Sequence, residues 1–143
     1  MVEYARNVLG IEDADHEESN PKASRLLISR LSCSLVGTSE RIEIQAGTLA
    51  YRVYGKGETV ERYSCNYSLN PKYQEQINRS KLKVVGRNDK GAVRIIELEG
   101  QRFFLASLFL PQRSSTAEKP HLMIMRYLEE ALRFRQLRQE VEM

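Results

Sequence analysis

Residues 81–110 read KLKVVGRNDKGAVRIIELEGQRFFLASLFL. This stretch contains three runs rich in β-branched and other apolar residues, at 81–87, 92–98 and 103–110. The two segments between the runs, Asn88-Asp89-Lys90-Gly91 and Glu99-Gly100-Gln101, have the composition of tight turns. The pattern therefore predicts a β-meander.

Before the meander, the sequence predicts a helix, a loop and then extended chain. Apolar residues at helical spacing favour a short helix over residues 2–9, and the polar, acidic stretch 12–24 is typical of a loop. We expect short strands or irregular extended chain over three further stretches, at residues 26–36, 41–54 and 59–67.

Two more helices complete the expected order of elements. Asn70 and Pro71 are a good N-cap and first residue for a helical run that reaches Leu82. Apolar residues from Leu122 to Leu137 recur at the spacing of an amphipathic final helix. This mixture of helices and strands predicts an α/β fold in which helices cover the sheet.

The size and composition of the chain indicate one folded domain over residues 1–143. Apolar residues make up 41% and charged residues 29%, while Gly and Pro are few, so neither a disordered nor a collagen-like chain fits. A chain of this length buries roughly two-thirds of its unfolded surface. It needs no disulfide or metal for stability, and it has no room for two full-sized catalytic domains.

Charge and apolar patterning indicate no nucleic-acid or membrane partner. The 22 Lys and Arg residues exceed the 19 Asp and Glu residues by only 3, and the two signs are interleaved. The first residues lack the apolar core of a secretory signal, and no stretch approaches the roughly 20 apolar residues of a membrane span. The only cysteines, Cys33 and Cys65, are expected to be unpaired in a reducing compartment, so we expect the protein in the cytoplasm.

A search for motifs finds no metal site and no cofactor site. The two histidines, His16 and His121, have no metal-ligand neighbour at the usual spacings, and the glycine-rich phosphate motifs and the hydrolase elbow are absent. We expect His121 to be a surface residue at a helix start. His16 is either a solvated loop residue or a pH-responsive or ligand-facing group.

Two other groups of residues leave alternatives open. Cys65 is either a candidate nucleophile or an inert, partly buried thiol, because no activating base lies near it in the sequence. The arginines of the final helix alternate with glutamates, which indicates a solvated face or, alternatively, an anion-binding surface. These arginines are Arg126, Arg133, Arg135 and Arg138.

Several segments together resemble one family. They are EYARNVLG at 3–10, residues 14–19, Glu61-Arg62 with Tyr67, Asn70 and Tyr73, residues 91–98, residues 103–112, and Pro120-His121 with the closing helix. In order and spacing they resemble the C-terminal part of the class I glutamine amidotransferase domain of CTP synthase. Cys65-Asn66-Tyr67 and residues 108–112 look closest to a set of shorter proteins related to the CTP synthase C-terminal region.

The resemblance implies a partial class I glutamine amidotransferase-like fold, with a mixed sheet flanked by helices. That domain is a glutaminase that supplies ammonia for converting UTP to CTP in pyrimidine nucleotide biosynthesis. Its nucleophilic Cys lies in a GxCxGxQ turn upstream of the motif that begins at Glu3, so we expect this turn and the strands before it to be lacking. Leu110 and Gln112 occupy the positions of the family's catalytic His and its orienting Glu, so we expect a pseudoenzyme without catalytic residues.

The resemblance also implies four substrate-binding residues. Glu18 falls where the family has a carboxylate facing the ammonium of glutamine, and Tyr67 falls on a tyrosine of the pocket. Cys65 and Asn66 precede that tyrosine, and Asn66 replaces an arginine that would pair with the glutamine carboxylate. Because a neutral amide cannot form that ion pair, affinity for amino acids should be weakened. The expected ligand is an amino acid or another small molecule, with no cofactor.

Three functions follow as alternatives. The chain is a small-molecule-binding or regulatory domain without glutaminase activity, a truncated fragment of a longer CTP-synthase-like glutaminase, or a structural oligomerisation domain. An unpaired strand edge and an uncovered apolar helix face would favour association. We therefore expect a homo-oligomer or pairing with a chain that supplies the missing N-terminal half.

Overall fold

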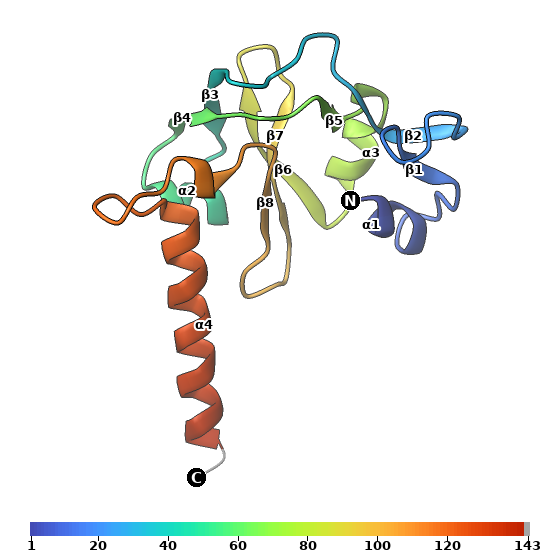
Figure 1. Ribbon diagram of the computed structural model, residues 1–143. Coiled ribbons are helices and arrows are strands. Elements are labelled where there is room, and N and C mark those ends of the chain that lie inside the picture. The colour runs from blue at the N-terminus through green and yellow to red at the C-terminus, as the bar shows by residue number, and fades with distance from the viewer. Residues whose placement is uncertain (142–143) are drawn as a thin grey trace.

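Two β-sheets and the helices around them make up the structure, a computed structural model that describes residues 1–141 (Figure 1). In chain order the elements are α1 (Val2–Asn7), β1 (Ala14–His16), β2 (Arg25–Arg30), β3 (Ser39–Ile44), α2 (Leu49–Tyr54), β4 (Glu58–Arg62), β5 (Tyr67–Leu69), η1 (Pro71–Tyr73), α3 (Gln74–Arg79), β6 (Leu82–Asn88), β7 (Val93–Leu98), β8 (Leu105–Ser107), η2 (Pro111–Arg113) and α4 (Leu122–Val141). The expected mixed α/β architecture is confirmed.

The larger sheet has the strand order β4-β3-β6-β7-β8, and all its neighbours are antiparallel. Its last three strands are the predicted meander, although β8 is shorter than the run 103–110. The turn between β6 and β7 forms as its composition predicts. The side-chain oxygen of Asn88 accepts hydrogen bonds from the N–H groups of Lys90 and Ala92, and Gly91 adopts a positive φ of 75°.

The smaller sheet has the order β1-β2-β5, with β1 parallel to β2 and β5 antiparallel to β2. The prediction that residues 12–24 form only a loop is wrong, because residues 14–16 are strand β1. Ala14 is fully buried, and its carbonyl accepts a hydrogen bond of 2.7 Å from Nε of Arg6. Contact with α1 and pairing with β2 thus order part of an otherwise polar segment.

The prediction of extended chain over 41–54 is correct only for its first part, because residues 49–54 form helix α2. Two side chains accept hydrogen bonds from backbone N–H groups in the first turn of this helix. Thr48 Oγ1 accepts a hydrogen bond from Tyr51 N–H, and the carboxylate of Glu97 accepts the N–H groups of Leu49 and Ala50 at 2.8 and 3.3 Å. By contrast, the helical run that opens at Asn70 is confirmed as η1 and α3, although α3 ends at Arg79 and Leu82 begins β6.

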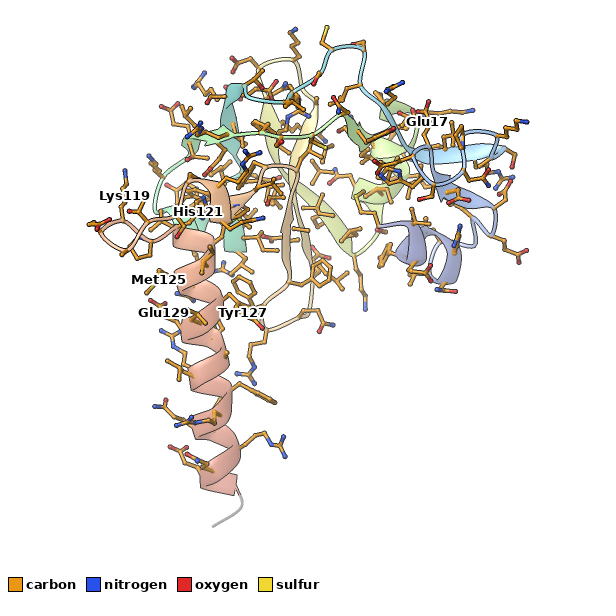
Figure 2. All side chains as sticks on the ribbon, viewed as in Figure 1. Glu17, Lys119, His121, Met125, Tyr127 and Glu129 are labelled. Carbon is orange, nitrogen blue, oxygen red and sulfur yellow. The ribbon has the colours of Figure 1, made fainter. Side chains whose placement is uncertain are left out.

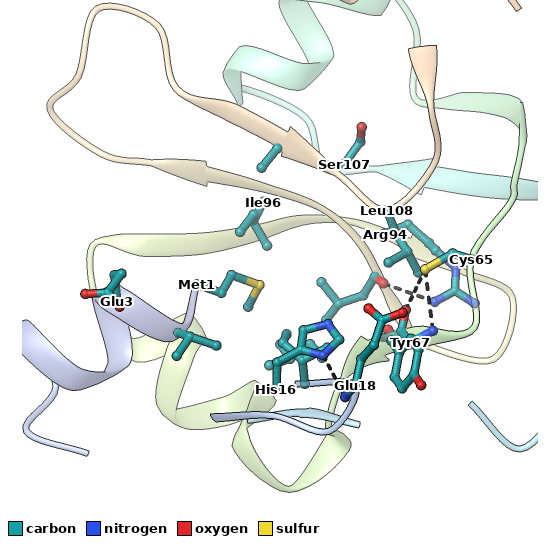
Figure 3. A pocket seen from close by; sticks show the side chains of 16 residues that line it. Met1, Glu3, His16, Glu18, Cys65, Tyr67, Arg94, Ile96, Ser107 and Leu108 are labelled. Carbon is teal, nitrogen blue, oxygen red and sulfur yellow. Dashed lines mark hydrogen bonds between the residues drawn. The ribbon is translucent and has the colours of Figure 1, made fainter. Parts of the chain in front are cut away.

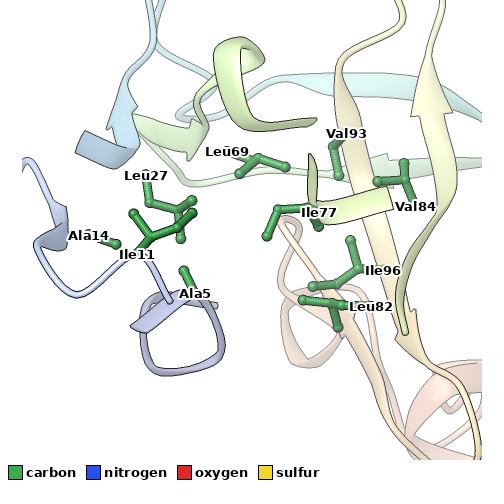
Figure 4. Packing of buried hydrophobic residues seen from close by; sticks show 10 residues of the cluster. All are labelled: Ala5, Ile11, Ala14, Leu27, Leu69, Ile77, Leu82, Val84, Val93 and Ile96. Atoms are coloured by element: carbon green, nitrogen blue, oxygen red, sulfur yellow. The ribbon is translucent and has the colours of Figure 1, made fainter. Parts of the chain in front are cut away.

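Hydrophobic residues pack on both faces of the larger sheet. One cluster contains Val84 and Ile96 and lies against α1, α3 and the smaller sheet (Figure 4). The other contains Val85 and Ile95 and lies against α2 and the start of α4. Since neighbouring residues of a strand point to opposite faces, β6 and β7 contribute to both cores at once. The expected covering of the sheet by helices is confirmed.

The final helix forms as predicted, but most of it projects away from the sheets (Figures 1 and 2). His121, just before its first turn, and Met123 are buried against the body, whereas Met125 and Tyr127 are exposed. The ring of Tyr127 still contacts that of Phe103, with 5.9 Å between their centroids. Within residues 1–141, no helix combines the length and apolarity that crossing a membrane requires.

The close approach of β6 and β7 at Gly86 should make this position intolerant of a side chain. A Cβ atom there would lie 2.8 Å from Cβ and Cγ1 of Ile95, a residue that is fully buried. We expect Gly86→Ala to lower the free energy of unfolding by about 1–3 kcal/mol, measured by urea denaturation. Gly57→Ala is the control, because its Cβ would have no neighbour closer than 3.9 Å. Equal stability of the two variants would contradict this packing.

Candidate functional site

A cavity of about 540 Å³ lies where residues of the two sheets and the start of α1 meet (Figure 3). Its walls are mainly apolar and include Val2, Ile28, Leu69, Ile96 and Leu108. The polar and ionisable side chains in its lining are Glu3, His16, Glu18, Cys65, Tyr67, Ser68, Arg94 and Ser107. An apolar cavity of this size with a few polar groups has the character of a small-molecule site.

Of the four residues expected to bind substrate, Glu18, Cys65 and Tyr67 line this cavity, and Asn66 does not. Asn66 is exposed, while its backbone carbonyl accepts a hydrogen bond of 2.8 Å from Leu31 N–H. Asn66 lies in a bend just before β5, and its neighbours Cys65 and Tyr67 line the cavity while Asn66 does not. The structure therefore brings together three of the four residues.

Cys65 is held by the backbone of Tyr67. Its thiol donates a hydrogen bond to the Tyr67 carbonyl, with Sγ 2.9 Å from the oxygen, and its sulfur accepts the Tyr67 N–H at 3.5 Å. No histidine hydrogen-bonds to this thiol within residues 1–141. Cys65 is half-buried and Cys33 is exposed, and both are unpaired as the sequence predicts.

His16 contacts both Tyr67 and Glu18. It lies on β1, half-buried, and its ring centroid is 5.0 Å from that of Tyr67. Its Nδ1 accepts a hydrogen bond of 3.1 Å from Glu18 N–H, which assigns a neutral ring with its proton on Nε2. Of the two interpretations of His16, the solvated loop is therefore wrong. The structure places His16 at the cavity.

Arg94 also lines the cavity, but its charge is already paired. The side chain is 3% exposed, and its Nε and Nη2 donate to the carboxylate of Glu40 at 2.6 and 3.3 Å. Its Nη1 donates to the Val93 carbonyl, and its guanidinium lies 5.6 Å from the ring centroid of Tyr63. Burial by itself would raise the pKa of Glu40, but hydrogen bonds from Arg94 and Asn88 outweigh it and lower that pKa overall.

Leu110 and Gln112 lie just beyond the cavity. Leu110 is half-buried at the N-cap of η2, and Gln112 is exposed within η2. Neither residue lines the cavity and neither side chain can accept a proton at neutral pH. Within residues 1–141, no cluster of three or more His, Cys, Asp or Glu side chains is arranged to hold a metal ion.

A separate polar cluster lies in the second core, and it corrects the prediction that His121 is a surface residue. His121 is 9% exposed, and its Nε2 lies 3.2 Å from both carboxylate oxygens of Glu61, which is 4% exposed. Its Nδ1 accepts a hydrogen bond of 3.1 Å from Met123 N–H, which assigns the ring proton to Nε2, and Nε2–H donates a hydrogen bond to Glu61. The cluster attaches the start of α4 to β4.

Tyr54 on α2 completes this cluster. Its hydroxyl donates a hydrogen bond of 2.7 Å to Glu61, and burial together with that bond raises the pKa of Tyr54 well above its usual range. Sequence reasoning missed the cluster because Glu61 and His121 are 60 residues apart. Arg94 and its partner Glu40, 54 residues away, were missed for the same reason.

Comparison with known proteins relates the chain to one enzyme. No family model matches it. The CTP synthase of Sulfurisphaera tokodaii is 34% identical over 140 residues, which are 92% of this chain and 26% of that protein. The CTP synthase of Syntrophus aciditrophicus is 32% identical over 150 residues, 98% of this chain and 28% of that protein. The chain thus spans about a quarter of the length of these relatives.

A solved structure shows the same fold. It is the glutaminase domain of Trypanosoma brucei CTP synthase with bound acivicin, and it superposes with a TM-score of 0.85 at 24% identity. The match covers 92% of this chain and 55% of that one. The expected glutamine amidotransferase-like fold is therefore confirmed.

The Arg94–Glu40 pair should make stability depend on pH. Because the folded state lowers the pKa of Glu40, its stabilisation is complete above the ordinary value of 4.5 and is lost as pH falls through the lower folded value. We expect Glu40→Gln to cost about 1–3 kcal/mol at neutral pH and to reduce the loss of stability on acidification. Urea denaturation at stepped pH measures both effects.

Glu118→Gln is the control for this measurement, because Glu118 is exposed and lies outside the Arg94–Glu40 pair. This variant should follow the wild-type dependence on pH. If Glu40→Gln lost stability in acid as steeply as the wild type, Glu40 would not contribute in this way.

Proposed function

We propose that this chain is a small-molecule-binding or regulatory domain without glutaminase activity. The proposal starts from its resemblance to part of the glutaminase domain of CTP synthase. One observation carries the proposal. Glu18, Cys65 and Tyr67 line one cavity, whereas Leu110 and Gln112 stand where the resemblance places the catalytic base and its partner. A role connected with pyrimidine nucleotide synthesis rests on the resemblance alone.

The chemistry of amide hydrolysis supports inactivity. Attack of a thiolate on a carboxamide requires a nucleophile, a proton acceptor and donors for the oxyanion, and loss of central members costs on the order of 10⁴–10⁶ in rate. Leu110 and Gln112 cannot accept a proton. The thiol of Cys65 donates a hydrogen bond to the Tyr67 carbonyl, and within residues 1–141 no histidine hydrogen-bonds to it.

The cavity supports binding. Its volume of about 540 Å³ is in the range of small-molecule sites, and its apolar walls would bury most of a ligand of that size. Asn66 is exposed and does not line it, so this position offers no anchor for a carboxylate. These features favour a ligand other than glutamine itself.

A variant that fills the cavity tests this proposal. We expect at least one compound among L-glutamine, related amino acids and nucleotides to raise the melting temperature of the wild type, since a ligand at ten times its Kd adds about 1.4 kcal/mol of stability. Ala106→Phe should abolish that rise, because Ala106 on β8 lines the cavity. Purified wild type should release no ammonia from L-glutamine.

Val60→Phe is the matched control, because Val60 on β4 is 67% exposed and does not line the cavity. It should keep the response to ligand. Failure of every compound to shift the melting temperature would refute binding. Steady ammonia release that survives purification to homogeneity would refute inactivity, and its loss in Cys65→Ala would identify the nucleophile.

The exposed part of α4 favours a second candidate function, oligomerisation. Met125, Leu128 and Leu132 are 40–56% exposed and follow one another at helical spacing, so they form a stripe on one side of the helix. A projecting helix of this kind is marginal by itself in water. Burial of the stripe against a partner would therefore stabilise it.

We commit to a second copy of this chain as the partner. Glu129 and Glu130 pair with Arg126 and Arg133 of the same helix, so these charges are balanced within one copy and would not repel a second. The alternative partner is a chain that supplies the remainder of a glutaminase-like domain, since the match covers only 55% of the similar structure.

Sedimentation over a range of concentrations tests self-association. We expect the wild type to form a dimer or larger oligomer and the double variant Leu128→Glu/Leu132→Glu to remain monomeric, because charges interrupt the apolar stripe. Leu137→Glu makes the same kind of change at an exposed position on the opposite side of the helix, and this variant should still associate. A wild type that stays a compact monomer at high concentration would contradict self-association and leave the second chain as the partner to seek.

A further inference from the structure

The ionisable side chains of the cavity do not balance in charge. Three of them carry a charge at neutral pH, the carboxylates of Glu3 and Glu18 and the guanidinium of Arg94. His16 accepts a hydrogen bond at Nδ1 and is therefore neutral. Which of these groups is available to a ligand depends on the partners that each already has.

Two of the three charges are already engaged. Glu40 accepts two hydrogen bonds from the Arg94 guanidinium, and the remaining Nη1 donates to a backbone carbonyl. The carboxylate of Glu3 accepts a hydrogen bond of 2.9 Å from Asn7 and lies 3.4 Å from Arg6. Neither group has its full charge free to bind a ligand.

Glu18 remains. Its backbone N–H is bonded to His16, but within residues 1–141 its carboxylate has neither a hydrogen-bond donor nor an ion-pair partner. Through the bond of its backbone N–H to His16, and the contact of His16 with Tyr67, Glu18 belongs to the same contiguous group as Cys65 (Figure 3). The cavity thus combines apolar walls with one unpaired negative charge.

We propose that the cavity binds a primary amine that has an apolar body and no carboxylate, with its ammonium group on Glu18. The inference deepens the proposed function and rests on it. A carboxylate on the ligand would enter a cavity whose only guanidinium is already neutralised, and it would lose water without gaining a cation in return. The unpaired charge of Glu18 therefore selects against α-amino acids and in favour of amines.

A matched series of four compounds tests the charge preference. The probes are 2-phenylethylamine, 2-phenylethanol, 3-phenylpropionate and L-phenylalanine, which share an aromatic body and differ in charge. By calorimetric titration, we expect the amine to bind about threefold to fivefold more tightly than the alcohol, the strength of a solvent-accessible ion pair. The acid and the amino acid should bind more weakly than the amine, and 1 M NaCl should reduce the preference for the amine.

Glu18→Gln should remove the difference between amine and alcohol and leave the affinity for the alcohol unchanged. Because Glu18 is exposed, this variant should fold normally. Glu12→Gln is the control, since Glu12 is an exposed carboxylate of the same acidic segment that does not line the cavity, and it should bind like the wild type.

The outcomes separate this inference from the proposed function. Equal binding of amine and alcohol, an unchanged preference in Glu18→Gln, or tighter binding of L-phenylalanine would overturn the inference while the cavity remained a binding site. If none of the four compounds bound and the broader ligand panel also failed, the proposed function and the inference would fall together.

Discussion

Arg94 places a guanidinium group, only 3% exposed, inside the larger sheet. An unpaired charge at such a position would cost several kcal/mol, so the fold depends on the acceptors around it. Glu40 on β3 accepts hydrogen bonds from Arg94 on β7 and from Asn88 on β6, and one carboxylate thus joins three strands. The same pairing cancels positive charge at the cavity that Arg94 lines, which leaves Glu18 to set its electrostatic character.

The parts of the fold that could be predicted from sequence are those whose signals are local. The meander of residues 81–110 carries its own alternation and its own turn residues, and Asn70 caps the helical run that it opens. Helix α2 could not be predicted in the same way, because Glu97 completes its N-terminus from 48 residues away. Burial of His121 likewise depends on Glu61, a partner distant in sequence that no spacing rule identifies.

The candidate site was predictable in part, and through resemblance more than through pattern. Resemblance pointed to Glu18, Cys65 and Tyr67, which share a cavity, and also to Asn66, which does not line it. Asn66 lies in the bend that precedes β5, and the sequence gives no local signal for which side chains of such a bend face the cavity. His16 contributes because pairing of β1 with β2 fixes its position, and an acidic, polar segment gives no local indication of that strand.

Helix α4 also determines how far the molecule reaches. Its 20 residues span about 30 Å at the usual rise per residue, comparable to the diameter of a small domain. The buried contact between His121 and Glu61 anchors its first turn, and the segment before β8 contacts it farther along, Phe103 at the Tyr127 ring and Arg102 at the Phe134 ring. Beyond Phe134 the helix continues to Val141, away from both sheets (Figure 1). Its last turns therefore lie far from the cavity between the two sheets, so a surface that met the end of the helix would stand well away from that cavity.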